Sequence, residues 1–280
     1  MAVRTVARSR PRRNRVAGFV REWGPVVVAV LLIRSFLVEA FMVPTGSMED
    51  TIAVGDFMLV NKFIYGVKLP FYGKTILRVT EPKRGDIVVF RFPADPDMPA
   101  DPARPDRFRR IFPEWLPLLP VYWDAQRSFF TFYTPRNFIK RCVAVAGDTV
   151  EYRDKQLYVN GVRQVFPYVV HKTPYVLPGM DPMPPDFQEQ WQSLRFYQSE
   201  SSRYVRDFFG PVVIPPGHIM AMGDNRDNSE DSRFWGPLDL DHVKGKPLVL
   251  YFSSSAAPNI ARIILSPWAI RLERIGRIVR

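Results

Sequence analysis

A serine in a short turn and a lysine on a predicted strand are the two side chains of this sequence that could together hydrolyse a bond. Ser47 lies in the stretch 43–51, where Pro44 fixes its own φ and Gly46 reaches backbone angles closed to other residues. Such a turn leaves a hydroxyl and an amide uncovered, as a nucleophile requires. Taken alone, these residues are more typical of an ordinary loop than of a catalytic turn.

Lys140 lies in the run 138–146, which predicts a strand ending at the turn Gly147-Asp148. Alternation along a strand places the lysine on one face with Cys142, Ala144 and Ala146, all small residues that leave room for another group to approach. A lysine amine can take a proton from serine only when it is uncharged, so its pKa must fall from about 10.4 through burial. The alternative is a solvated surface lysine.

Other hydrolytic chemistries find less support. The three histidines, at 171, 218 and 242, are not near a Gly-x-Ser-x-Gly elbow, so a Ser-His-Asp triad is not indicated. We can single out neither a pair of carboxylates for glycoside hydrolysis nor a phosphate-binding glycine loop. Three scattered histidines and one cysteine do not suit a zinc site. We therefore expect neither a metal nor an organic cofactor.

The formal charge of +11 over 280 residues is concentrated at the two ends of the sequence. Residues 1–22 contain seven arginines and one acidic residue, residues 260–280 contain five arginines and one acidic residue, and the remainder is nearly neutral. This distribution indicates contact with anionic membrane lipid and argues against a nucleic-acid groove.

The segment 23–42 is the only one apolar enough to enter a bilayer, and we interpret it as an uncleaved transmembrane anchor. A cleaved targeting segment is the alternative, but no Ala-x-Ala site follows the apolar run. The basic residues before this segment place the N-terminal region 1–22 in the cytoplasm and the chain from about 43 onward outside.

Beyond the serine turn, the pattern predicts a mainly β, antiparallel catalytic core over 43–163 and 212–259. Short β-branched and aromatic runs at 57–63, 86–92, 218–222 and 247–253 predict strands. The runs 149–152 and 156–159 continue the sheet, and Asn160-Gly161 predicts a hairpin.

The proline-rich stretch 93–136 is an insertion, either a surface flap or a patch touching the bilayer. Residues 164–211 form a less regular inserted subdomain. The basic tail 260–280 is an amphipathic helix either on the membrane or on its own domain, which Pro267 would interrupt.

Four blocks of this sequence resemble the bacterial type I signal peptidases, which are membrane-anchored endopeptidases with a Ser-Lys dyad. The stretch 44–48 (Pro-Thr-Gly-Ser-Met) is similar to the nucleophile box, and 55–66 is similar to the box that follows it. Ile139-Lys140-Arg141 with Gly147-Asp148 is similar to the lysine box, and 223–236 matches the Gly-Asp-Asn-Arg-Asp-Asn-Ser box throughout. The resemblance covers the anchor and the core but not 93–136 or 164–211.

The resemblance implies a role for each matched residue. Ser47 would be the nucleophile and Lys140 the general base, while the Ser47 amide and the Thr45 hydroxyl would form the oxyanion hole. Ser229 would orient the lysine, and Asp231 and Arg233 would form an ion pair beneath the site. The positions expected near substrate or membrane are Met48, Cys142 and Ala144. Ala144 and Ala146 stand where the family usually has glycine and proline, so the substrate channel could differ in shape.

The implied function is removal of N-terminal signal peptides from exported preproteins after small residues of the Ala-x-Ala type. The implied location is the bacterial plasma membrane, with one span and the catalytic domain on the periplasmic side. A self-cleaving Ser-Lys protease and a membrane-tethered binding or assembly module are the alternatives. The sequence does not indicate an oligomeric state.

Overall fold

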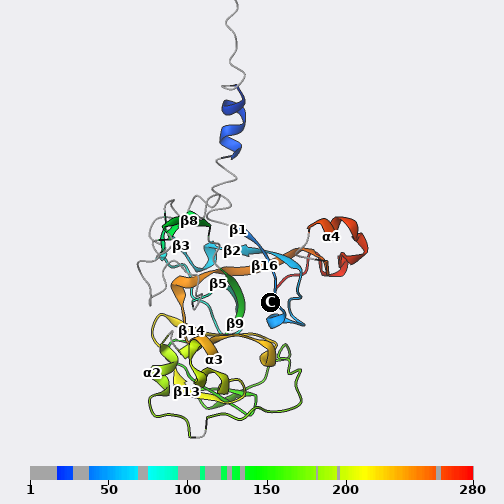
Figure 1. Cartoon of the computed structure of the whole chain (residues 1–280). Coiled ribbons are helices and arrows are strands. Elements are labelled where there is room, and N and C mark those ends of the chain that lie inside the picture. The colour runs from blue at the N-terminus through cyan, green and yellow to red at the C-terminus, as the bar shows by residue number, and fades with distance from the viewer. Residues whose placement is uncertain are drawn as a thin grey trace, which may run out of the picture.

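The computed structural model of the protein describes residues 18–27, 38–68, 75–93, 108–110, 121–124, 128–132, 136–180, 182–193, 196–256 and 260–279. Its centre is an antiparallel seven-stranded sheet with the order β1-β2-β16-β5-β9-β14-β15 (Figure 1). The strands are β1 (Val38–Met42), β2 (Asp56–Asn61), β5 (Ile87–Arg91), β9 (Asn137–Val145), β14 (His218–Met222), β15 (Leu238–Asp239) and β16 (Val243–Ser253). The mainly β, antiparallel prediction is confirmed for the described residues.

Both faces of this sheet are covered by apolar side chains. On β5, Ile87 and Val89 belong to one buried cluster, whereas Val88 and Phe90 belong to another. A continuous run of β-branched and aromatic residues is the pattern expected of a strand buried on both faces. The two clusters fix the register of β5 against β9, which carries Lys140.

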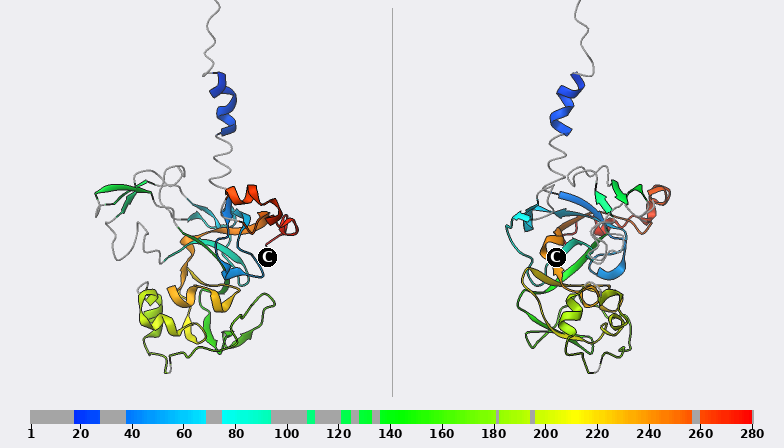
Figure 2. Two further views of the ribbon diagram at one scale, coloured as in Figure 1. Left: turned by 45° about the vertical axis from the view of Figure 1, so that its right-hand side comes forward. Right: turned by 60° about the vertical axis from the view of Figure 1, so that its left-hand side comes forward.

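A second, four-stranded sheet has the order β12-β11-β10-β13. It contains β10 (Thr149–Arg153), β11 (Gln156–Val159), β12 (Val162–Gln164) and β13 (Phe209–Val213) and is covered by α2 (Phe187–Gln192), as Figures 1 and 2 show in the lower half of the molecule. Asn160 and Gly161 have φ values of 53° and 75°, as the hairpin prediction requires. Residues 149–159 were expected to continue the main sheet; the turn at Gly147, with φ of 85°, directs them into this separate sheet instead.

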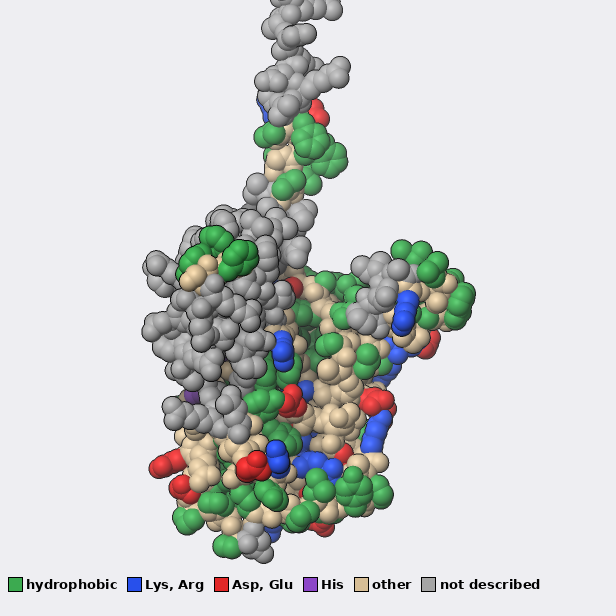
Figure 3. All heavy atoms as spheres, in the orientation of Figure 1, with side chains coloured by type: hydrophobic (Ala, Val, Ile, Leu, Met, Phe, Trp, Pro, Cys, Tyr) green, Lys and Arg blue, Asp and Glu red, His purple; other side chains and the backbone are tan. Residues whose placement is uncertain are grey.

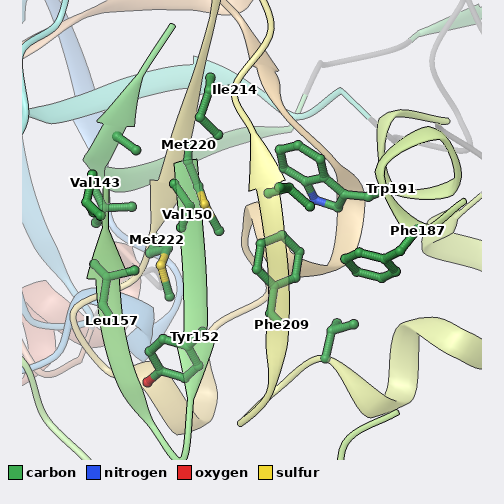
Figure 4. Packing of buried hydrophobic residues seen from close by; sticks show 14 of the residues in the cluster. Val143, Val150, Tyr152, Leu157, Phe187, Trp191, Phe209, Ile214, Met220 and Met222 are labelled. Atoms are coloured by element: carbon green, nitrogen blue, oxygen red, sulfur yellow. The ribbon is translucent and has the colours of Figure 1, made fainter. Parts of the chain in front are cut away.

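The segment 164–211 does not stand apart as a subdomain of its own. Phe187, Trp191 and Phe209 pack in one cluster with Val150 and Tyr152 of β10 (Figure 4). Three edge-to-face ring contacts join Phe187, Phe196, Trp191 and Phe209 in pairs 5.5–5.7 Å apart. The expected inserted subdomain and the second half of the expected core therefore share one hydrophobic core.

Short elements complete the described part of the chain. Within the insertion 93–136, a three-stranded sheet is formed by β6 (Phe108–Arg110), β7 (Val121–Asp124) and β8 (Phe129–Phe132), and most of the rest of the insertion lies outside the described residues. The others are β3 (Val67–Lys68), β4 (Thr75–Leu77), α3 (Ser232–Trp235) and the 3₁₀ turns η1 (Gly46–Met48), η2 (Phe63–Tyr65), η3 (Phe196–Gln198), η4 (Glu200–Tyr204), η5 (Arg226–Asn228) and η6 (Leu240–His242).

The predicted anchor 23–42 is only partly within the described residues. Residues 18–27 are helical, 28–37 lie outside the description, and 38–42 form β1, which pairs with β2 from Val38–Asn61 to Met42–Phe57. The outer end of the predicted anchor was therefore wrong, since backbone groups bonded into a sheet cannot belong to a spanning helix. Among the helices that the structure describes, none combines the length and apolarity needed to cross a membrane.

The tail does not form one long helix. It consists of α4 (Ile260–Leu265), η7 (Pro267–Ala269) and η8 (Leu272–Arg274), because Pro267 cannot continue α4. The segment that follows bonds to β16, with Leu250 N donating to Arg277 O and Val279 N donating to Leu248 O. Residues from about 269 onward thus pack on their own domain, as one of the two alternatives predicted, but without the expected continuous helix.

Candidate active site

Ser47 is presented by η1, which is separated from β1 by only three residues. Thr45 precedes η1 in an extended conformation, and the Ser47 residue is 6% exposed. Met48 holds the turn in place, since its carbonyl accepts bonds from the amides of Thr51 and Ile52. Met48 was expected to line the approach to the bilayer; the structure instead buries it completely in the cluster around Val43 and Ile52.

Lys140 reaches Ser47 from the centre of β9. Its Nζ lies 2.5 Å from Ser47 Oγ, and the residue is 3% exposed. Burial lowers the pKa of Lys140 to about 8, although the nearby carboxylates of Asp231 and Glu230 act in the opposite direction. A hydroxyl and an amine within hydrogen-bond distance, with the amine partly neutral near physiological pH, can exchange a proton.

A β-bulge in β9 changes the predicted surroundings of the lysine. Ala144 lies opposite Met220 and Cys142 lies opposite Ala221, so that Val143 has no residue facing it. Cys142 shares a buried cluster with Val88, the residue opposite Lys140, as alternation predicted. Ala144 instead joins the cluster of the second sheet, so the expected face of three small residues is interrupted.

The box 223–236 lies directly against the serine turn. Asn225 N donates to Ser47 O at 3.1 Å, and the Asp224 carboxylate accepts from Thr51 Oγ1 at 2.7 Å. Arg141, the neighbour of the lysine, donates to both oxygens of Asp224 at 2.9 and 2.8 Å. The predicted site did not include Arg141, Asp224 or Asn225, although all three stand in the quoted boxes and the charges of Arg141 and Asp224 could have suggested an ion pair.

The remaining candidates lie around this centre in different settings. Asp231 and Arg233 form a fully buried bidentate pair, with contacts of 2.9 and 2.8 Å. Burial opposes ionisation of Asp231, but the charge and hydrogen bonds of Arg233 outweigh it and keep the pKa of Asp231 below its usual value.

Ser229 is buried beside Gly223, and no hydrogen bond joins it to Lys140 within the described residues. Thr45 is exposed.

No group of three or more His, Cys, Asp or Glu side chains in the described part of the chain could hold a metal ion. The site brings together the hydroxyl of Ser47 and the buried amine of Lys140 on a β scaffold. Such a pair is typical of serine hydrolases in which a lysine serves as the base.

Comparison with known proteins identifies the family. Residues 16–252 match the family described as signal peptidase, peptidase S26, and the chain belongs to it. It is a serine endopeptidase of the signal peptidase I type.

Among similar proteins, signal peptidase I of Pseudomonas fluorescens is 35% identical over 85% of this chain and 75% of the relative, and that of Pseudomonas aeruginosa is 36% identical over the same shares. Signal peptidase I of Aquifex aeolicus is 31% identical over 90% and 94%. A solved signal peptidase I from Enterococcus faecalis covers 60% of this chain and 97% of its own, with 21% identity and a TM-score of 0.29.

Proposed function

We propose that this protein is a membrane-anchored endopeptidase that removes N-terminal signal peptides from exported preproteins after small residues. The observation that carries this proposal is the 2.5 Å contact between Ser47 Oγ and the buried Lys140 Nζ in a chain of the signal peptidase family. Ser47 is the nucleophile and Lys140 the general base. Neither a metal nor an organic cofactor takes part.

In the first step, neutral Lys140 takes the hydroxyl proton of Ser47 while Oγ attacks the carbonyl carbon of the scissile peptide. The negative charge on the carbonyl oxygen is stabilised by the Ser47 amide and the Thr45 hydroxyl, and the lysine then gives its proton to the leaving amine. Water, deprotonated by Lys140, hydrolyses the acyl-enzyme and restores Ser47. Ser229 orients the lysine from the buried wall beside Gly223, and the Asp231–Arg233 pair braces the box.

The substrate binds as an extended strand beside the catalytic residues. β1 supports this idea because it is an edge strand of the large sheet and leads directly to Thr45 and Ser47. A peptide that adds to a sheet edge gains main-chain hydrogen bonds and directs alternate side chains toward the protein. The small side chains of Ala-x-Ala then fit shallow pockets near Ser47 and Cys142.

The enzyme acts at the bacterial plasma membrane with its catalytic domain on the periplasmic side. The basic N-terminal region and the apolar segment that follows it support a single span with a cytoplasmic N-terminus. Contact with anionic lipid is supported by apolar side chains on and after α4, where Ile264, Leu265 and Trp268 are 73%, 73% and 81% exposed and Arg262 and Arg271 lie nearby (Figure 3).

The proposal is tested with Ser47→Ala and Lys140→Met in the full chain, reconstituted in lipid and given a preprotein with an Ala-x-Ala site. Each variant should lose at least about a thousandfold in cleavage rate, because neither the nucleophile nor the base can be replaced. Ser255→Ala and Lys172→Met, which change exposed residues of the same types, serve as controls. Full activity of either dyad variant would refute the mechanism.

Mass analysis of the products and a serine-directed covalent probe distinguish the alternatives. Cleavage after Ala-x-Ala and labelling that Ser47→Ala abolishes support the signal peptidase function. A cut within the chain itself would indicate a self-cleaving protease. A correctly folded protein that neither cleaves nor reacts with the probe would indicate a binding or assembly module.

A further inference from the structure

Arg226, in the middle of the box 223–236, is a buried cation whose donors are largely unused. The residue is 2% exposed, and neither its Nε nor its Nη2 has a hydrogen-bond partner among the described residues. Within the same part of the chain, its Nη1 contacts the thioether sulfur of Met222, at 3.8 Å, which is a weak acceptor. An unpaired buried charge is costly, so such a group calls for a partner.

The carboxylates around Arg226 are already committed to other cations. Asp231 is paired with Arg233 at 2.8 Å, and Asp224 with Arg141 at 2.8 Å. Asp227, the next residue in the chain, accepts from Lys155 at 3.0 Å. Each of these three acids is thus paired with at least one other base, and Asp227 also contacts His171. Within the described residues, no carboxylate is paired with Arg226.

A second unpartnered donor lies in the same region. Tyr152 is 1% exposed, and none of the residues that the structure describes forms a hydrogen bond with its hydroxyl. Two contacts place Tyr152 and Arg226 around the same side chains. The Arg233 guanidinium lies 5.1 Å from the centre of the Tyr152 ring and donates to Arg226 O, and Met222, which Arg226 Nη1 contacts, shares a buried cluster with Tyr152. Figure 4 shows the ring of Tyr152 near Met222, with the hydroxyl directed away from Phe209.

We propose that Arg226 Nε and Nη2, together with the Tyr152 hydroxyl, bind a small inorganic anion of the size and charge of chloride inside the protein. The arginine nitrogens can only donate, so their partner must accept. A single negative charge also neutralises the unpaired guanidinium, which a water molecule does not. Both residues are almost fully buried, which favours a monatomic anion over a larger one.

The anion is a structural ligand of the box and not a reactant. Arg226 O accepts a hydrogen bond of 2.8 Å from Arg233 Nη2, so the backbone of η5 is tied to the Asp231–Arg233 pair. An anion that fixes the guanidinium of Arg226 therefore stabilises the same loop from its other side. A ligand that binds only the folded chain raises the unfolding temperature with its concentration.

Thermal unfolding of the full chain in detergent tests this directly. Sodium chloride replaces sodium gluconate at constant ionic strength, so only the anion changes. Above the dissociation constant, each tenfold rise in chloride should raise Tm by about 2–5 °C, and bromide should act similarly. Equal Tm values in chloride, bromide and gluconate would overturn the proposal.

Substitutions test which residues give rise to the chloride dependence of Tm. Tyr152→Phe removes only the hydroxyl, and the chloride concentration above which Tm begins to rise should increase about tenfold. Arg226→Met removes the cation and should abolish the chloride dependence. Arg153→Met and Tyr158→Phe, which alter a partly exposed pair on the same sheet, should leave it unchanged. An undiminished chloride effect in Tyr152→Phe would refute the assignment even if Arg226→Met does not fold.

Crystals grown in bromide give an independent answer. The proposal expects an anomalous peak within hydrogen-bond distance of Arg226 Nη2 and Tyr152 Oη. A water molecule at that place without anomalous signal would show that the two donors are satisfied by solvent, and the proposal would be wrong.

Discussion

On the acidic side of the pH–rate profile, the rise of kcat/KM with pH should follow the loss of the proton from the buried Lys140. An ordinary lysine has a pKa of 10.5, and burial lowers that of Lys140 to about 8. This difference means that burial destabilises the charged form of Lys140 relative to the neutral form by about 3 kcal/mol. At pH 7 roughly a tenth of the molecules then carry the neutral amine, against roughly one in three thousand for an ordinary lysine. We therefore expect kcat/KM to rise about tenfold per pH unit up to pH 7, and to reach half its maximum near pH 8.

The assay is the cleavage of an Ala-x-Ala peptide without titratable side chains, from pH 6 to 10. Glu230→Gln removes a carboxylate that raises the pKa of Lys140, so the half-maximum should move down by about 0.2–0.7 pH unit, in keeping with the exposure of Glu230. Glu200→Gln, which changes an exposed acid paired with Arg203, is the control. A half-maximum near pH 10, or an upward shift in Glu230→Gln, would refute the idea that burial activates this lysine.

The burial of Lys140 also makes the stability of the folded chain depend on pH in a predictable direction. Because the pKa of Lys140 is lower in the folded chain, the unfolded chain binds more protons between pH 8 and 10.5. Stability of the wild type relative to Lys140→Met should therefore rise with pH across this window and be constant below it. Thermal unfolding at pH 7 should find the variant the more stable of the two.

Three further predictions concern the surroundings of the dyad. Thr45→Val should lower kcat about 10²–10³-fold with little change in KM, whereas Thr45→Ser should remain active in the same assay. Gly223→Ala would place a methyl group 2.5 Å from Ser47 O, so we expect more than about tenfold loss of kcat, and an unchanged rate would contradict this packing. Arg274→Ala should cost about 2 kcal/mol of stability by thermal unfolding, because it takes the main partner from buried Asp56. The pKa of Asp56 is lowered in the fold, so this loss should be full above pH 3.8 and should fade as the pH drops further.

The sequence predicted the strands of the main sheet well because their signals are local. β5 and β14 begin and end within one residue of the predicted runs, since each is a β-branched or aromatic run bounded by turn residues. The pairing of Ser47 with Lys140 was predicted through the box pattern and the requirement for a buried lysine, and their side chains lie within hydrogen-bond distance in the structure. The distance between Ser47 Oγ and Lys140 Nζ could not be predicted, because it depends on the pairing of β9 with β5 and with β14.

The errors arose where long-range pairing decides between two local possibilities. Residues 38–42 are apolar enough for a helix in lipid and β-branched or aromatic enough for a strand, and only the presence of β2 beside them settles the matter. The bulge at Val143 leaves no mark in the sequence, since the residues around it alternate normally. Likewise, β10 pairs not only with the neighbouring β11 but also with β13 (Phe209–Val213), which lies far along the chain.

The ion pair between Arg274 and Asp56 bears on the biogenesis of the protein. Arg274 Nη2 donates to Asp56 at 2.6 Å across 218 positions of the chain, and Asp56 in turn accepts from the amide of Ala53 in the loop behind the nucleophile. During translation, Ser47 is synthesised long before Arg274. In a nascent chain that has not yet reached Arg274, Asp56 therefore lacks this partner, and the loop that holds Ala53 is tied to the rest of the structure by fewer bonds.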